Sequence, residues 1–194
     1  MIKYIKENLD SIFKLFINHM GMMIFSLVVL LTSKLISSKM NNNAIFYIMG
    51  AISVLMYFSL IYTAMWEKGA QDKIKIDGGR LNKNIFSGLY FYLIANAIAI
   101  FAGVVALIFS FFITKEASFV NDVYAVFRLI SHYYNGMYMW ITQLNFASPV
   151  IHSLIYIAVI IPGTLVAFVS YILGVKGFKC IFPEPKRDHN RRVR

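Results

Sequence analysis

Three long stretches of the sequence contain no Asp, Glu, Lys or Arg, and they constrain the fold more than any other feature. They cover residues 40–66, 84–114 and 129–175, and the last one includes two histidines, His132 and His152. About 20 apolar residues are enough for an α-helix to cross the hydrocarbon core of a bilayer. Each stretch is long enough for at least one crossing, so we expect an integral membrane protein.

The overall composition supports the same expectation. Hydrophobic residues make up 59% of the 194 residues, charged residues make up 14%, and the mean hydropathy is +0.65. Soluble domains contain about 45–50% apolar and about 25% charged residues. A soluble fold of this size has too little interior to bury so much apolar surface, and we therefore expect the excess to face lipid.

We expect an all-α fold in which four transmembrane helices form a single domain over residues 1–182. The first span is the weakest, because His19 lies near its start and Lys34 near its end, from where a lysine reaches the headgroups. In the fourth span, the pair Pro162-Gly163 predicts a kink. The four spans are expected at about residues 15–36, 44–66, 85–114 and 150–175.

Two segments outside these spans have the periodicity of amphipathic helices. In residues 2–16, apolar side chains recur at helical spacing, which is typical of a helix in the membrane interface. The alternative is that this segment extends the first span. In the loop at 115–148, the pattern predicts a second interfacial helix, and the Tyr and Trp residues after it favour a re-entrant piece. The alternative there is a fifth span through 129–146.

The distribution of Lys and Arg predicts the orientation of the spans. Three of these residues lie in the N-terminal stretch, five in the loop at 67–84 and seven in the tail, which places 15 on one side of the membrane. The other side carries four, two in the first turn and two in the long loop. Positive charge is enriched in cytoplasmic segments, so we expect both termini in the cytoplasm and the protein in the plasma membrane.

Small side chains follow one face of the third span and one face of the fourth. In lipid, helices associate by close packing at such residues. These faces pack either on each other, which closes the bundle, or on a partner subunit. Asn96 lies beside the first face, and we expect its amide to form a hydrogen bond across helices. The two faces consist of Ala95, Ala99, Gly103 and Ala106, and of Gly163, Ala167, Ser170 and Gly174.

The loop between the second and third spans is the most strongly charged internal segment. Around its Gly78-Gly79 pair, apolar and polar residues alternate, which is a signal for a short β-hairpin. Its functional interpretation is a docking element that binds a soluble partner through Lys73, Lys75 and Arg80. The alternative is a solvated turn, because isolated two-stranded hairpins are marginally stable in water.

The common signatures of catalysis and metal binding are missing from the sequence. It has no P-loop, no metal-binding H-E-x-x-H motif and no G-x-S-x-G nucleophile motif. The single cysteine, Cys180, excludes an intramolecular disulfide and a multi-cysteine metal site. The predicted spans carry no Asp or Glu near mid-membrane, where coupled carriers usually place carboxylates. We therefore expect no enzyme activity, no cofactor and no metal.

One group of residues on the predicted outer side is a candidate site. His132 and His152 both fall near that surface, where they could flank a lipid-headgroup site together with Tyr133, Tyr134 and Trp140. The alternative is that these side chains lie in the membrane interface without a special role.

The tail at 183–194 is rich in Arg and Lys. We expect it to be disordered and to contact anionic lipid headgroups, as basic segments beside a membrane span usually do. It does not interleave aromatic residues as a base-stacking surface would, so nucleic acid is not expected as a partner.

Three functions are compatible with these features. The leading hypothesis is a non-catalytic subunit or scaffold of a membrane complex related to transport, bound to a membrane or cytosolic protein. The second is a permease or pore that forms by self-association into a homo-oligomer. The third is a membrane protein that binds or modifies lipid headgroups through its outer residues.

Overall fold

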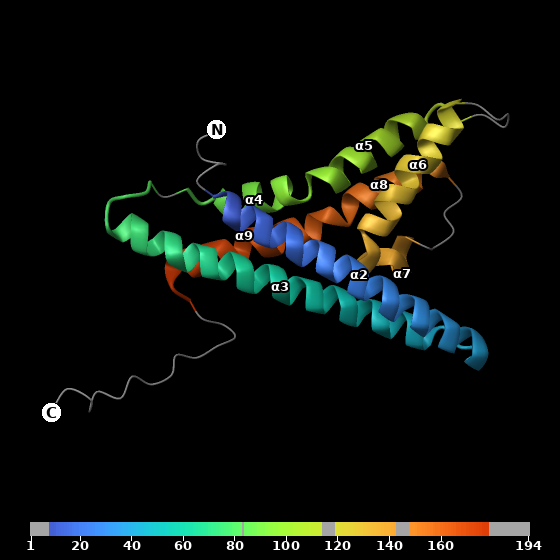
Figure 1. Ribbon diagram of the computed structural model, residues 1–194, viewed down its shortest axis with the longest axis horizontal. Coiled ribbons are helices and arrows are strands. Elements are labelled where there is room, and N and C mark those ends of the chain that lie inside the picture. The colour runs from blue at the N-terminus through green and yellow to red at the C-terminus, as the bar shows by residue number, and fades with distance from the viewer. Residues whose placement is uncertain (1–7, 83, 114–118, 143–147, 179–194) are drawn as a thin grey trace.

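The computed structural model of the chain is helical throughout its regular secondary structure. It describes residues 8–82, 84–113, 119–142 and 148–178, and every regular element in these ranges is a helix (Figure 1). The expected all-α fold is therefore confirmed. The elements are α2 (Leu9–Met40), α3 (Ala44–Asp77), α4 (Ser87–Ala95), α5 (Ala97–Ser110), α6 (Phe119–Tyr134), η1 (Gly136–Tyr138), α7 (Met139–Thr142), α8 (Pro149–Ala158) and α9 (Ile160–Lys176).

Three or four of the helical segments are long and apolar enough to cross a membrane. They are α2, α3 and the pair α8–α9 taken together, with α4 and α5 as a fourth if this bent pair is counted as one span. Helix α2 begins at Leu9 without a break near residue 16, so residues 9–16 extend the first span. The rest of the predicted interfacial helix and the basic tail lie outside the described residues.

Helices α2 and α3 form a long antiparallel hairpin with a tight polar turn. Asn41 adopts the left-handed conformation that ends α2, with φ 49°. The Ala44 amide donates a hydrogen bond to Asn42 Oδ1 at 2.9 Å, and the Phe46 amide donates to Ser37 Oγ at 3.2 Å. The side chains of Asn42 and Ser37 thus satisfy backbone amides at the start of α3, which would otherwise lack partners.

The predicted β-hairpin after the second span is wrong, because α3 continues through it to Asp77. The helix ends in a Schellman motif, in which the Gly79 amide donates to the Ile76 carbonyl and the Arg80 amide donates to the Lys75 carbonyl, both at 2.9 Å. Gly79 has φ +68°, which favours glycine. The Gly-Gly pair therefore marks a helix terminus and not a strand turn.

The third predicted span bends by 66° at Asn96, between α4 and α5. Both the backbone amide and the side-chain Nδ2 of Asn96 donate to the Tyr92 carbonyl at 3.0 Å. The Asn96 amide therefore bonds within its own chain segment, where we expected a bond across helices. Asparagine competes for backbone groups in this way inside helices, which accounts for a bend at this position.

The fourth span is interrupted at Val159, three residues before Pro162. Proline has no amide hydrogen to donate to the carbonyl four residues earlier, here that of Ala158, and its ring crowds that carbonyl. The interruption lies one turn before the Pro162-Gly163 pair that predicted the kink, because the lost hydrogen bond belongs to the preceding turn.

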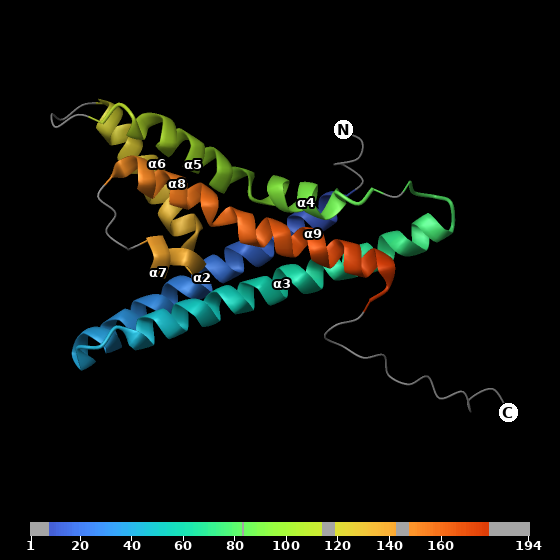
Figure 2. The same cartoon turned by 180° about the vertical axis from the view of Figure 1, so that it is seen from behind.

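Close packing of α9 on α3 forms the most extensive helix contact among the described elements, and Figure 2 shows the two helices side by side. A Cβ atom on Gly174 would overlap the Trp66 carbonyl oxygen, and one on Gly69 would overlap the Tyr171 carbonyl oxygen. The backbones of α3 and α9 therefore touch, which is the usual way for helices to associate in lipid.

The two predicted small-residue faces are both buried within the chain, but they pack mainly on larger neighbours. On α5, Gly103 lies against Ile157 of α8, where an added Cβ would come within 3.1 Å of Cγ1. On α9, Gly163 lies against the Tyr92 hydroxyl of α4, and Gly174 packs on α3. These contacts leave both faces covered by other helices of the same chain.

Helix α6 turns back into the molecule beside α5. Together, α6, η1 and α7 lie between α8 and the α2–α3 hairpin (Figures 1 and 2). Gly136 of η1 approaches the Met23 backbone of α2, where an added Cβ would lie 3.1 Å from the carbonyl oxygen. Gly136 thus ends the regular helix, and the described residues form no fifth spanning helix in this region.

The α3–α9 contact predicts the effect of one methyl group. Gly174→Ala should lower the stability of the purified protein by about 1–3 kcal/mol, because the added Cβ must push two backbones apart. The measurement is the midpoint of thermal unfolding in detergent.

Gly21→Ala is the matched control, since nothing lies within 4 Å of its Cβ position in α2. This control should leave the midpoint unchanged or raise it slightly, because Ala is the better helix former. Equal midpoints for the two variants would contradict direct backbone contact.

Candidate functional site

A cavity of about 390 Å³ lies between α6, α7 and α8, and we call it the basic cavity. The residues of α6 that line it are three or four positions apart, which places them on one face of a helix. Helix α8 adds two aromatic residues one turn apart, and α7 adds a hydroxyl group. The described lining residues are Ala125, Arg128, Leu129, His132, Thr142, His152 and Tyr156.

Thr142 fixes the orientation of the His132 ring. Thr142 Oγ1 lies 3.1 Å from His132 Nδ1 and 3.4 Å from the Met139 carbonyl oxygen. In the neutral ring, one nitrogen carries the proton and the other accepts, so the Thr142 hydroxyl either donates to Nδ1 or accepts from Nδ1–H. In the charged imidazolium, Nδ1–H is the donor to Thr142 Oγ1.

Tyr156 holds the other polar groups of the basic cavity together. The Arg128 guanidinium lies beside the Tyr156 hydroxyl. The His132 ring lies edge-on to the Tyr156 ring at a centroid distance of 6.3 Å, and the His152 ring lies tilted to it at 6.4 Å. Since Tyr156 is almost fully buried, it forms a fixed wall for all three basic side chains.

The electrostatic environment of the basic cavity is positive. Burial lowers the pKa of His132, and the charges of Arg128, His152 and Lys34 lower it further. No carboxylate is among the described lining residues to offset these charges. The site therefore presents a permanent guanidinium charge beside a histidine that stays neutral at neutral pH.

The structure brings together only part of the predicted outer-surface site. His132 and His152 line the same cavity, on two different helices. Tyr133 is exposed, with its ring 5.6 Å from that of His132 but outside the lining. Tyr134 is buried in the centre of the bundle, and Trp140 packs against α3. The sequence did not single out Arg128, Thr142 or Tyr156, because their meeting depends on α6 folding back toward α8.

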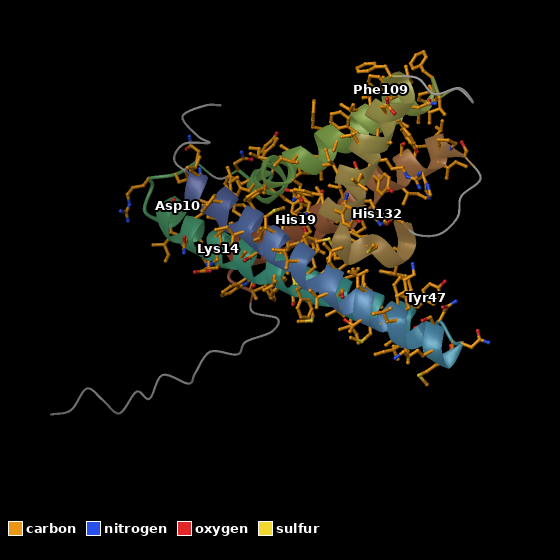
Figure 3. The ribbon with its side chains drawn as sticks, turned by 45° about the vertical axis from the view of Figure 1, so that its right-hand side comes forward. Asp10, Lys14, His19, Tyr47, Phe109 and His132 are labelled. Carbon is orange, nitrogen blue, oxygen red and sulfur yellow. The ribbon has the colours of Figure 1, made fainter. Side chains whose placement is uncertain are left out.

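His19 lies in the centre of the molecule (Figure 3). A chain of hydrogen bonds begins there, and we call it the His19 chain. His19 Nε2 lies 2.9 Å from the Tyr134 carbonyl oxygen, so this nitrogen is the donor. His19 Nδ1 consequently accepts from the Tyr57 hydroxyl at 2.7 Å, and the Tyr92 hydroxyl donates to Tyr57 at 2.9 Å. All the groups on the chain are buried, and it joins α2, α3, α4 and α6.

A buried ion pair lies on α3, in the segment that was predicted to be a loop. Lys68 Nζ donates to Asp72 Oδ1 at 2.8 Å, and the Tyr171 hydroxyl of α9 donates to Asp72 Oδ2 at 3.0 Å. Lys68 Nζ also lies 5.8 Å from the ring centroid of Phe91. The i,i+4 spacing of Lys68 and Asp72 predicts an ion pair on a helix, but only if that helix continues past Trp66.

The predicted docking residues do not form one surface element. Lys73 is partly buried, and its Nζ lies close to Gly177 at the C-terminal end of α9, where a cation is favourable. Lys75 and Arg80 are exposed, whereas Gly78 and Gly79 end the helix. Only Lys75 and Arg80 thus remain available for a charged contact with another molecule.

The residues described by the structure contain no group of three His, Cys, Asp or Glu side chains that could hold a metal ion. Comparison of the chain with protein-family models, curated proteins and solved structures finds no match. The geometry of the basic cavity is therefore the basis of the functional argument.

The ion pair on α3 predicts a large cost for removing one partner. Asp72→Ala leaves the Lys68 charge buried without its carboxylate, and such changes cost about 3–5 kcal/mol. The double variant Lys68→Met/Asp72→Ala should recover part of this loss. Thermal unfolding of the purified variants measures both effects.

Glu67→Ala is the control, because it removes the partner of Lys14 from an exposed ion pair. The side chains of that pair are 53% and 52% exposed, against 7% and 2% for Lys68 and Asp72. Exposed pairs contribute about 0–1 kcal/mol, so Glu67→Ala should be nearly neutral. A similar loss of stability for Glu67→Ala and Asp72→Ala would contradict the distinction between an exposed and a buried ion pair.

Proposed function

We propose that the protein crosses the plasma membrane four times, with both termini in the cytoplasm. The crossings are α2, α3, the bent pair α4–α5 and the pair α8–α9. Large apolar side chains remain exposed along each of them, for example Val28, Leu55, Phe101 and Leu165. The start of α2 and the ends of α3 and α9 lie toward one end of the molecule, which agrees with the side that carries 15 of the Lys and Arg residues (Figure 1).

Within this arrangement, the basic cavity opens toward the outer side and binds an anionic group, the phosphate of a lipid headgroup. The observation that carries this proposal is the convergence of Arg128, His132 and His152 on one cavity whose described lining has no carboxylate. A guanidinium group matches the geometry of phosphate oxygens, and charge-assisted hydrogen bonds are the strong ones. Thr142 and Tyr156 supply further polar groups.

A lipid is favoured over a soluble anion by the surface next to the basic cavity. Val126 and Leu129 on α6 and Ile151 and Leu154 on α8 are large, apolar and exposed. Acyl chains can lie along these residues while the phosphate enters the cavity. An anionic headgroup would also lie at the depth where Tyr133 is exposed, as is usual for tyrosine in the membrane interface.

The geometry favours binding over catalysis. Thr142 and His132 resemble a nucleophile with its base, but the base has no carboxylate to orient it. The alternative of a scaffold subunit in a transport-related complex now depends on Lys75 and Arg80, because the small-residue faces are covered within the chain. A pore formed by self-association is less favoured, because large apolar side chains such as Val28, Leu55 and Leu165 are exposed along the described helices.

The orientation predicts which positions can be labelled from outside. In a Cys180→Ser background, Asn42→Cys should react with a membrane-impermeant maleimide on intact cells, whereas Arg80→Cys should react only after permeabilisation. Both positions are exposed at the ends of helices. The reverse labelling pattern would contradict the proposed orientation.

The binding site predicts a loss of lipid when the guanidinium group is removed. Arg128→Gln should weaken binding of anionic phospholipids by about ten- to a hundred-fold, because a hydrogen bond to a charged group contributes about 1.5–3 kcal/mol. Native mass spectrometry of the detergent-purified protein, titrated with phosphatidic acid or phosphatidylglycerol, measures this.

The matched control is Arg80→Gln, which removes an exposed guanidinium group at the other end of the molecule. It should leave the affinity unchanged, and phosphatidylcholine should bind weakly to all variants. Undiminished binding of anionic lipid to Arg128→Gln would count against the basic cavity as the site.

A further inference from the structure

The basic cavity has more capacity for positive charge than a singly charged anion needs. Arg128 is always protonated, and His132 and His152 can each gain a charge. Lys34 of α2 adds its field from outside the lining. Thr142 of α7 and Tyr156 of α8 face the same space as neutral groups, and no described lining residue is acidic. None of the described lining residues therefore supplies the negative charge that a bound ligand would bring.

We infer that the ligand group is a doubly charged phosphate monoester, bound together with one proton that His132 takes up. This inference rests on the proposed function, since it specifies which anionic headgroup the basic cavity accepts. The charge balance is simple: the ligand brings two negative charges, Arg128 contributes one positive charge, and the imidazolium of His132 contributes the other.

The hydrogen bond to Thr142 determines which nitrogen of the charged His132 ring is left for the ligand. Both nitrogens of the imidazolium carry a proton, and Nδ1–H donates to Thr142 Oγ1 at 3.1 Å. Nε2–H can therefore donate to a phosphate oxygen without loss of the Thr142 bond. The ring keeps its place against Tyr156, so protonation changes the charge of the site and leaves its shape intact.

The electrostatic cost of this proton falls when a dianion enters. In the empty cavity, burial and the charges of Arg128, His152 and Lys34 lower the pKa of His132. A doubly charged anion offsets that repulsion and raises the pKa again. Binding therefore strengthens as the pH falls through the range between the raised and the lowered pKa, and it becomes independent of pH below the lowered one. A phosphate diester has one negative charge, which Arg128 alone balances.

Two matched pairs of ligands test the inference on the purified full chain. Sulfate and methyl sulfate are soluble anions with two charges and one, and neither is protonated near neutral pH. Phosphatidic acid and phosphatidylglycerol are the corresponding lipids, a monoester and a diester. Isothermal titration in buffers of different ionisation enthalpy counts the protons taken up, and the sulfate titration repeated over a pH series gives the linkage.

We expect phosphatidic acid to bind at least about tenfold more tightly than phosphatidylglycerol, because one further ion pair forms. Sulfate should bind with uptake of up to one proton, and its Kd should fall by up to about tenfold per unit decrease in pH. His132→Gln should abolish the uptake and the pH dependence. Tyr133→Phe, beside His132 but outside the cavity, should keep both.

Each other outcome has a definite meaning. Equal affinity for the monoester and the diester, without proton uptake, would overturn the inference and leave the proposed function intact. Binding of all these anions equally to wild type and to Arg128→Gln would overturn both. Tight sulfate binding with proton uptake, but no preference for phosphatidic acid over free sulfate, would support the dianion and identify a soluble source for it.

Discussion

The hydrogen bond between His19 and the Tyr134 carbonyl determines where α6 ends, and the basic cavity depends on that position. The last carbonyl groups of a helix have no partner within the helix. His19 Nε2, on α2, donates a hydrogen bond to one of these carbonyl groups, that of Tyr134. The His19 ring also stacks on the Tyr134 ring, with 4.5 Å between the ring centroids. A helix terminus inside a membrane protein is tolerated only where the protein satisfies its backbone. The His19 chain provides this, so α6 can turn back at Gly136.

The same requirement explains where the other helices break. The bend at Asn96 lies where the asparagine amide supports the Tyr92 carbonyl, and Tyr92 is also the last hydroxyl of the His19 chain. The interruption at Val159 follows from the missing amide hydrogen of Pro162. Each break gives a neighbouring helix a place to pack, and together they let α5, α6 and α8 diverge from the α2–α3 hairpin (Figure 1).

Much of the fold could be predicted from the sequence, because apolar length and helical periodicity are local properties. The helix segments, the turn at Asn41–Asn43 and the irregularity near Pro162 all follow from neighbouring residues. The end of α3 could not be read in the same way. Gly78-Gly79 ends a helix or turns a hairpin, and the choice depends on burial of Lys68 and Asp72 against α9.

The candidate site was predictable only in its histidines. The number of histidines and their place near the ends of apolar segments are visible in the sequence. Arg128 lies in a predicted loop, and no local pattern distinguishes it from other cationic loop residues. Its role depends on a contact over a separation of 28 residues with Tyr156, which no local pattern encodes. Tyr134 and Trp140 were grouped with the histidines by adjacency alone. The helical turn of α6 points the Tyr134 side chain away from His132, and the Tyr134 ring stacks on that of His19.

The charge of Arg128 connects the site to the stability of the fold. The Arg128 guanidinium lies beside the Tyr156 hydroxyl, and its five N–H donors can bind further acceptors. An exposed guanidinium group at the membrane surface attracts anionic headgroups, and a lipid phosphate is the counter-charge that the bilayer itself supplies. A ligand that binds only the folded form stabilises it by mass action. Under the proposed function, a bound lipid would therefore also stabilise α6, because the helix that carries Arg128 is the one whose inner end the His19 chain holds.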